Sequence, residues 1–240
     1  MMSGQASPAA GLKQRFEKIK QRIEICAARC NRDVEEITVV GISKTHPVEI
    51  LQHALVAGLT ELGENRVQEA EPKILQLGRD VARWHLVGHL QANKARRAVG
   101  LFDLLHSLDS ASLARRLDRL CIDEQRSEFH VLIQVDLAGE KTKSGVKETE
   151  LPELLVALAE CQRLRLIGLM TLPPFFEDLE AVRPFFRRLR ELRDDLQTRG
   201  HFAEGAGELS MGMSHDFEIA IEEGATMLRI GTAIFGERSP

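Results

Sequence analysis

Short apolar runs alternate with amphipathic stretches along most of the chain. The apolar runs predict eight strands, at residues 37–44, 61–63, 84–88, 104–108, 129–137, 166–172, 209–211 and 227–230. Apolar residues at helical spacing predict a helix over 12–29 and seven more between the strands, at 48–57, 67–77, 94–99, 112–121, 150–160, 179–198 and 216–223. Near-continuous apolar strands are typical of parallel strands covered on both faces. The pattern therefore predicts an α/β protein, a single (β/α)8 TIM barrel with an extra N-terminal helix.

A doubly wound open sheet is the main alternative, because it is built from the same alternation of strands and helices. It is disfavoured because no Gly-x-Gly-x-x-Gly turn follows the first predicted strand. Gly58, Gly78 and Gly224 follow predicted helices, where glycine commonly ends a helix. Residues 1–10 are small and polar and are expected to be disordered, whereas 11–240 are expected to form one domain.

Composition limits the partners that we expect. The 240 residues include 32 basic and 36 acidic side chains, so the chain lacks the basic surplus of nucleic-acid-binding proteins. No apolar run approaches the ~18 residues of a membrane helix, and the first residues do not resemble a signal peptide. Cys26 and Cys30 are one helical turn apart, but two thiols alone do not make a zinc site. We therefore expect a cytoplasmic protein with reduced thiols, no metal, and no membrane or nucleic-acid partner.

Lys44 ends the first predicted strand, at the edge of the barrel where functional residues collect in this fold. Burial in an apolar surrounding disfavours the charged form of an amine. A neutral lysine is a nucleophile, and its usual chemistry is a Schiff base with an aldehyde or ketone. The alternative is a solvated lysine whose side chain extends to the surface.

The last two predicted strands are followed by small residues that suit an anion. Ser210 to Ser214 follows the seventh strand, and Gly231 and Thr232 follow the eighth. Phosphate sites in barrels often form from these two loops, where backbone N–H groups point at the anion. Alternatively, Ser214 is only the N-cap of the helix predicted at 216–223, and Gly231 is only a turn residue. An aldehyde that also carries a phosphate suggests pyridoxal phosphate as the ligand.

Arg229 lies between apolar residues on the last predicted strand. A guanidinium facing the barrel interior needs an acceptor, and arginine is a known partner of the pyridine nitrogen of pyridoxal phosphate. The alternative is an ion pair with Asp136 or Glu64. Asn65 has two interpretations as well, because it is either a ligand donor or a helix cap.

Seven segments of the chain, found in order between about Ile37 and Arg238, resemble successive blocks of the pyridoxal phosphate homeostasis proteins. They are Val40-Gly41-Ile42-Ser43-Lys44-Thr45, Gly63-Glu64-Asn65-Arg66-Val67-Gln68-Glu69, Trp84 to Lys94, Lys143-Ser144-Gly145, Gly168-Leu169-Met170-Thr171, Leu209 to Ser214 and Arg229 to Gly236. The resemblance implies a barrel like the N-terminal domain of alanine racemase (fold type III). It also implies pyridoxal phosphate bound covalently to Lys44, with contacts from Asn65, Met211, Ser214, Arg229, Gly231 and Thr232.

In this resemblance Ser214, Gly231 and Thr232 would hold the phosphate, and Arg229 would face the ring nitrogen. The family is similar in fold to amino-acid racemases but has no established catalytic activity. It is thought to bind and deliver vitamin B6, so the implied partners are pyridoxal phosphate and enzymes that need it.

Catalysis is the main functional alternative. Barrel racemases use a tyrosine from a second domain as the second base, and this chain contains no tyrosine. We therefore expect a protein of vitamin B6 homeostasis that is not an efficient enzyme. A weak pyridoxal phosphate-dependent racemase, using His85 or Cys121 as the second acid, remains an alternative. So does an aldolase in which Lys44 attacks a ketone substrate.

Overall fold

The computed structural model describes residues 8–139, 144–203, 205 and 207–236. Its core is a closed barrel in which the strands follow chain order from β1 to β8. Each strand is parallel to both neighbours, and β8 closes the barrel by pairing with β1. The strands are β1 (Thr38–Ile42), β2 (Glu61–Glu64), β3 (Arg83–Leu86), β4 (Leu104–Leu108), β5 (Phe129–Gln134), β6 (Leu164–Met170), β7 (Glu208–Met213) and β8 (Met227–Ile230). The predicted TIM barrel is therefore confirmed.

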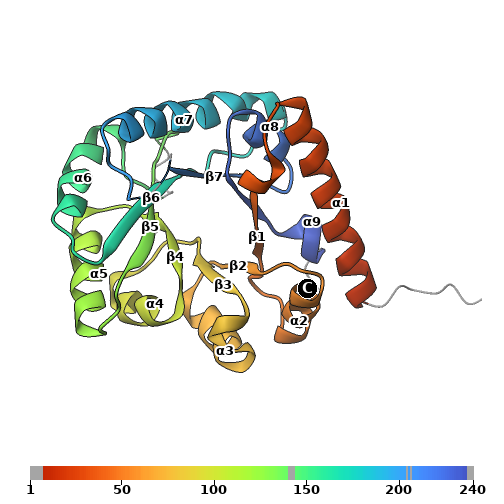
Figure 1. The fold of residues 1–240 in the computed structure, drawn as a ribbon, viewed down its shortest axis with the longest axis horizontal. Helices are drawn as coiled ribbons and strands as arrows, with labels where there is room; N and C mark the ends of the chain where they lie inside the picture. Colours follow the sequence, from red (N-terminus) through yellow and green to blue (C-terminus); the bar gives the residue numbers. More distant parts are fainter. Residues whose placement is uncertain (1–7, 140–143, 204, 206, 237–240) are drawn as a thin grey trace, which may run out of the picture.

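Helices surround the barrel on its outer side (Figure 1). They are α1 (Pro8–Arg29), α2 (Val48–Val56), α3 (Val67–Leu77), α4 (Ala95–Leu101), α5 (Ala111–Asp123), α6 (Leu151–Ala159), α7 (Arg183–Thr198), α8 (Phe217–Glu222) and α9 (Thr232–Phe235). Short 3-10 helices lie at Val34–Glu36, Arg79–Val81, Ala92–Lys94, Glu148–Glu150 and Leu179–Val182.

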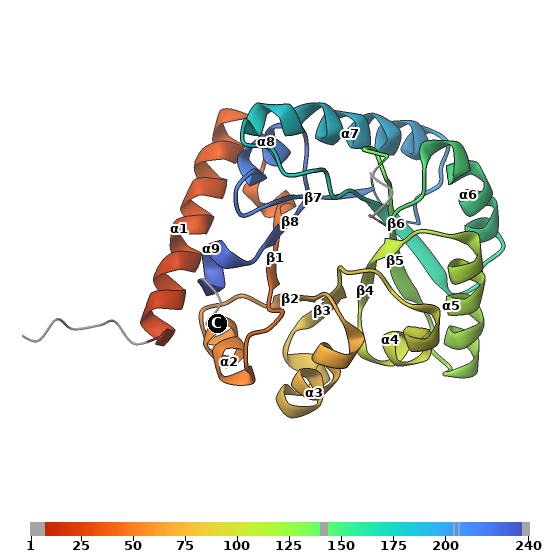
Figure 2. The ribbon, with the colours of Figure 1, turned by 180° about the vertical axis from the view of Figure 1, so that it is seen from behind.

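Helix α1 is the predicted extra helix, and it packs along α8 and α9 (Figures 1 and 2). Its apolar face is buried, and Arg15 donates a hydrogen bond of 2.7 Å to the backbone oxygen of Ile234 in α9. The N-terminal helix therefore ties the start of the chain to its last element. Residues 1–7 lie outside the described residues, so the expected disorder of 1–10 stays a prediction, and α1 already includes Pro8 to Ala10.

Several predicted strands are longer than the observed ones. β1 ends at Ile42 instead of Lys44, and β5 ends at Gln134 instead of Leu137. Ser43 and Val135 still donate backbone hydrogen bonds to Gly63 and Met170, and the apolar runs continue beyond these residues into the loops. α9 was not predicted, since four residues are too few to show a helical period. Gly58, Gly78 and Gly224 have φ of 91°, 96° and 97°, as expected of glycines that end helices.

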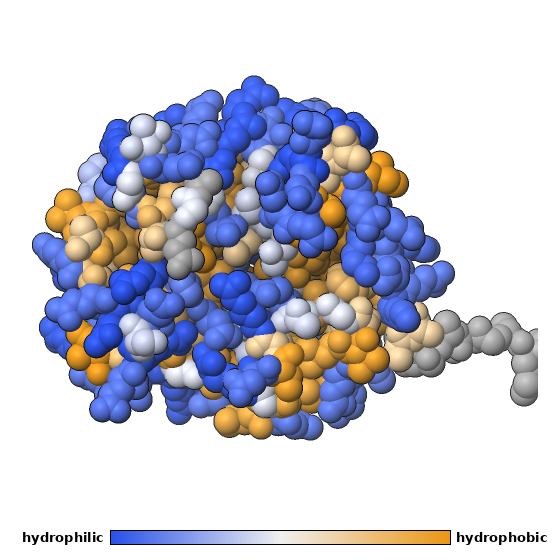
Figure 3. Space-filling view, in the orientation of Figure 1, coloured by the Kyte–Doolittle hydropathy of each residue, from blue (hydrophilic) through white to orange (hydrophobic). Residues whose placement is uncertain are grey.

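The apolar residues form two layers. A large cluster fills the space between the strands and the helices, whereas a smaller one lies inside the barrel and contains Leu104, Leu132, Ile167, Met170 and Met227. Hydrophilic side chains cover most of the face seen in Figure 3. The small size of the inner cluster leaves part of the barrel interior to polar side chains.

Candidate functional site

The C-terminal end of β1 is anchored from outside the barrel. Ser43 donates a hydrogen bond of 2.7 Å from its hydroxyl to Glu64 Oε1, and Lys73 Nζ donates one of 2.9 Å to the backbone oxygen of Ser43. Lys73 lies on α3, so these contacts draw Ser43 toward the helix layer. Lys44 follows Ser43 in the turn that leaves β1, two residues beyond Ile42. Lys44 is half-buried.

Glu64 belongs to this anchor and not to the barrel interior. It has no exposed surface, and its Oε1 lies 2.6 Å from Lys73 Nζ. Burial raises the pKa of Glu64, and the charge of Lys73 opposes this effect. The suggestion that Glu64 pairs with Arg229 is therefore wrong, because Glu64 faces α3.

Ser214 joins the loops that follow β7 and β8. Its hydroxyl oxygen accepts hydrogen bonds from the backbone N–H groups of Gly231 at 3.3 Å and Ala233 at 3.4 Å. The alternative that Ser214 caps the next helix is wrong, because the N-cap of α8 is Asp216. Thr232 begins α9 beside Gly231 and is exposed. The structure thus brings together the three residues that were predicted to hold a phosphate.

Gly212 permits this loop geometry. Its φ is 89°, and a Cβ at this position would lie 2.6 Å from Cβ of Ala220 and 3.1 Å from Cα of Phe217. Only glycine combines this backbone conformation with such a close approach to α8. The approach fixes where the chain leaves β7 and where Ser214 lies.

Arg229 lies inside the barrel on β8. Its Nη1 donates to the hydroxyl of Ser210 at 2.7 Å, and its Nη2 donates to the backbone oxygen of Thr171 at 2.8 Å. Burial lowers the pKa of Arg229 to about 10, so the side chain remains a cation at neutral pH. The suggested ion pair with Asp136 is wrong as well, because Asp136 Oδ1 accepts hydrogen bonds from backbone N–H groups in its own turn.

Asn65 follows β2 directly and does not cap α3, whose N-cap is Arg66. It lines a cleft of about 620 Å³ together with Gly88 and His89. A Cβ on Gly88 would lie 2.3 Å from the backbone oxygen of Asn65, so the two loops touch here. Met211 differs from the other predicted contacts, because it is fully buried in the cluster between strands and helices.

Sequence reasoning missed that two buried histidines lie side by side inside the barrel. His85, considered above only as the second acid of a racemase, lies within β3, and its side chain has no exposed surface. His106 in β4 lies beside it, with 2.8 Å between His85 Nδ1 and His106 Nε2. Burial lowers the pKa of both imidazoles, and that of His106 falls well below its usual range. The signal available in the sequence was one histidine at an inward-facing position in each of two neighbouring strands.

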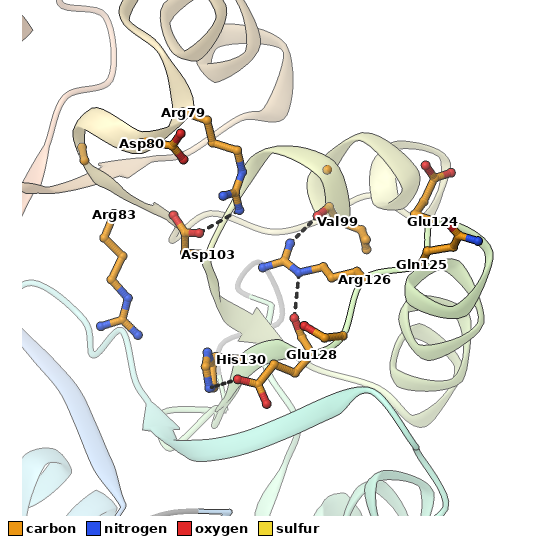
Figure 4. Close-up of a pocket in the computed structure, with 13 residues that line it drawn as sticks. Arg79, Asp80, Arg83, Val99, Asp103, Glu124, Gln125, Arg126, Glu128 and His130 are labelled. Atoms are coloured by element: carbon orange, nitrogen blue, oxygen red, sulfur yellow. Dashed lines mark hydrogen bonds and ion pairs between the residues drawn. The ribbon is translucent and has the colours of Figure 1, made fainter.

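A larger cleft, of about 880 Å³, lies at the opposite end of the barrel, where β3, β4 and β5 begin. Figure 4 shows Arg79 directed at Asp103 and Arg126 directed at Val99. The hydrogen bond from Arg79 to Asp103 is 2.7 Å long. A phosphate needs cations or N–H groups that converge on one point, so this cleft is less suited to it than the loops around Ser214.

A cysteine pair at the C-terminal end of α1 is the other cluster to consider. Ligand atoms of Cys26, Cys30 and Glu222 lie within 4.8 Å of one another. Burial raises the pKa of Cys26 to about 11, and Glu222 already pairs with Arg183 at 2.6 Å. A protonated thiol and an engaged carboxylate suit a metal poorly.

Comparison with known proteins agrees with this fold. The family model "alanine racemase, N-terminal domain" matches residues 15–239. A pyridoxal phosphate homeostasis protein of Aquifex aeolicus is 44% identical over 225 residues, which cover 94% of this chain and 97% of that protein. The chain belongs to the pyridoxal phosphate homeostasis protein family. Another member, from Escherichia coli, is 42% identical over 229 residues, covering 92% of this chain and 94% of that one.

A solved structure of the same family is also similar. PipY of Synechococcus elongatus, determined with pyridoxal phosphate bound, is 34% identical, with a TM-score of 0.82 over 94% of this chain and all of that one. An alanine racemase of Corynebacterium glutamicum shares the fold, at 16% identity and a TM-score of 0.65, over 93% of this chain and 61% of that one. Among the residues that the structure describes, no helix has the length and hydropathy of a membrane span.

Proposed function

We propose that this protein binds pyridoxal phosphate at the C-terminal mouth of the barrel, as a Schiff base of Lys44, and serves in intracellular vitamin B6 homeostasis. The observation that carries the proposal is the pair of hydrogen bonds from Gly231 and Ala233 to Ser214. It joins the loops after β7 and β8 close to the end of β1, with which β8 pairs. Membership of the family and the ligand of PipY support the same conclusion.

The residues present match the three polar parts of the cofactor. Lys44 Nζ supplies an amine for the aldehyde, and the C=N bond forms with loss of one water molecule. Ser214 and Thr232 supply hydroxyl donors for the phosphate, and Gly231, whose N–H donates to Ser214, lets the backbone approach it closely. Arg229 supplies a donor for the ring nitrogen, since a guanidinium has more N–H groups than its two recorded hydrogen bonds use. Asn65 lies beside the ring in this proposal, and Met211 supports the phosphate loop from the core.

We propose storage and delivery instead of efficient catalysis. When bound, pyridoxal phosphate acts as an electron sink, and this property is strongest when its ring nitrogen is protonated. Arg229 donates a hydrogen bond but keeps its proton, because its pKa is about 10. The chain also has no tyrosine for the second-base role. These two features weaken the alternative of a racemase.

The substitutes considered for the missing tyrosine are poorly placed. Cys121 lies on α5 with no exposed surface, and burial raises the pKa of its thiol to about 11. His85 is enclosed within the barrel. A weak racemase activity therefore remains only a minor alternative.

Absorption and trapping experiments test the proposal. The purified protein, mixed with pyridoxal phosphate, should turn yellow, and borohydride reduction should attach the cofactor to the peptide that contains Lys44. Lys44→Ala should lose both signals, whereas Lys94→Ala, a matched change at another partly buried lysine near the mouth, should keep them. Label on other lysines only, or a colourless protein that reacts with a ketone, would refute the assignment.

Delivery is tested separately. The loaded protein, freed of unbound cofactor, is mixed with an enzyme from which pyridoxal phosphate has been removed. We expect that enzyme to regain activity, and we expect the Lys44→Ala variant, treated in the same way, to restore none. We also place the protein in the cytoplasm, where its free cysteines stay reduced.

A further inference from the structure

A line of hydrogen-bonded side chains crosses the barrel interior, and the proposed function uses only its last member. Glu61 Oε2 lies 2.5 Å from His85 Nε2, and His85 Nδ1 lies 2.8 Å from His106 Nε2. His106 Nδ1 lies 2.8 Å from the hydroxyl of Ser210, which accepts a hydrogen bond of 2.7 Å from Arg229. Strands β2, β3, β4, β7 and β8 contribute one residue each.

These groups are shielded from water. His85, His106 and Ser210 have no exposed surface, and Arg229 is 4% exposed. A buried polar group costs free energy unless it is hydrogen-bonded, so every donor in such a line needs a matching acceptor. Glu61 is more exposed than the others, because it lies at the start of β2, and 24% of its side chain is accessible to solvent. The line therefore runs from the N-terminal end of the barrel to Arg229.

The two end groups determine the direction of every hydrogen bond in the line. A guanidinium only donates, and a carboxylate only accepts. Ser210 accepts from Arg229, so its own proton is directed at Nδ1 of His106. His106 must then carry its proton on Nε2 and donate it to Nδ1 of His85.

His85 in turn carries its proton on Nε2 and donates it to Glu61. Each imidazole is thus neutral and has one tautomer. Burial, which lowers the pKa of both rings, agrees with the neutral state.

We propose that Ser210, His106, His85 and Glu61 are positioning residues that form a one-directional hydrogen-bond relay and hold the guanidinium of Arg229 in a single orientation. The backbone oxygen of Thr171 fixes Nη2, and the relay fixes Nη1. The N–H groups that remain are then available to an acceptor at the mouth, which in the proposed function is the ring nitrogen of pyridoxal phosphate. The role of the relay in cofactor binding rests on that proposed function.

The first test uses the protein without cofactor. Nitrogen-15 NMR of the imidazole side chains distinguishes the two neutral tautomers from the cation, and loss of a signal in His106→Gln or His85→Gln assigns each ring. We expect both histidines to be neutral and protonated on Nε2 at neutral pH. A cationic ring, or a proton on Nδ1 of His106, would overturn the relay.

The second test acts at the far end of the line, away from the mouth. Glu61→Gln keeps an acceptor oxygen for His85, whereas Glu61→Leu removes it. We expect the first variant to keep the wild-type spectra and the second to change the signals of His85, because its Nε2–H loses its acceptor. Unchanged signals of His85 in Glu61→Leu would show that Glu61 is not the end of the line.

The third test measures the effect on the cofactor site. Ser210→Ala should weaken binding of pyridoxal phosphate by roughly tenfold, because Arg229 loses an acceptor that orients it. Nitrogen-15 NMR of ring-labelled cofactor should show an altered ring nitrogen in the same variant. Ser107→Ala is the matched control, since Ser107 is also a buried serine but donates to Gly88 at 2.7 Å, outside the relay.

The outcomes separate the two proposals. If the wild type shows the expected tautomers but takes up no pyridoxal phosphate, the relay stands and the proposed function fails. If it binds the cofactor and Ser210→Ala binds equally tightly with an unchanged ring nitrogen, the relay does not position Arg229. If Ser210→Ala does not fold, the spectra of the wild type and of the two Glu61 variants still test whether the relay exists.

Discussion

The ion pair between Lys73 and Glu64 gives the sharpest stability prediction. Lys73 Nζ donates to Glu64 Oε1 at 2.6 Å and to the backbone oxygen of Ser43 at 2.9 Å. Glu64 has no exposed surface, and Lys73 is 9% exposed. The substitution Lys73→Met keeps much of the side-chain volume but removes the charge and both hydrogen bonds. It leaves a buried carboxylate without its cation.

The expected cost follows from that burial. Removing one partner of a buried pair typically destabilises a protein by about 3–5 kcal/mol, because the remaining charge is left uncompensated. Within the described part of the chain, Glu64 Oε2 has no hydrogen-bond partner, so this oxygen adds no stabilisation to the carboxylate when Lys73 is replaced. Replacing both residues, as Lys73→Met with Glu64→Leu, leaves no buried charge and should cost only about 1–2 kcal/mol, mainly from the lost hydrogen bonds of Ser43.

Urea unfolding of the wild type, the two single variants and the double variant measures the free energies of unfolding and gives the coupling between the two sites. The matched control is Lys20→Met, which breaks an exposed pair with Glu17 at 2.8 Å and should cost less than about 1 kcal/mol. If Lys73→Met costs no more than Lys20→Met, or if the double variant is as unstable as the sum of the singles, the reasoning is refuted.

Three further predictions concern the strands, pH and the phosphate loop. Gly168→Ala should destabilise the barrel by roughly 2–4 kcal/mol in urea unfolding, because the new Cβ would lie 2.2 Å from a backbone oxygen of β7, whereas Gly100→Ala has open space and should be neutral or stabilising. Burial lowers the pKa of His85 and His106 from 6.5, so below that value the unfolded chain binds protons that the folded protein does not. The free energy of unfolding should therefore be highest above pH 6.5 and should fall with decreasing pH, by up to about 1.4 kcal/mol per pH unit for each ring. The slope should be smaller in His106→Asn, and an equal slope would contradict this. Ser214→Ala should weaken pyridoxal phosphate binding by roughly tenfold in an absorbance titration, and unchanged affinity would remove Ser214 from the proposed phosphate site.

Much of the fold could be predicted because it depends on local periodicity. The predicted bounds of β4, α3 and β8 agree with the structure to the residue, since each is a clear apolar run or helical pattern with a turn at either end. Lys44, Ser214 and Gly231 could be selected for a similar reason. In a barrel, residues that follow parallel strands share one end of the molecule, so sequence order alone places them near each other.

The partners of the buried charges could not be predicted in this way. Glu64 and Arg229 were both candidates for one ion pair, but the strand alternation directs Glu64 to α3 and Arg229 into the barrel. Which side of a strand faces inward depends on register and closure, and a shift of one residue exchanges the two sides. Pattern along the chain thus determined the eight strands, the helices around them and the loops that carry the candidate site. Only the closed barrel decided that Arg229 meets Ser210, because hydrogen bonds across the interior join residues whose separation in sequence carries no periodic signal.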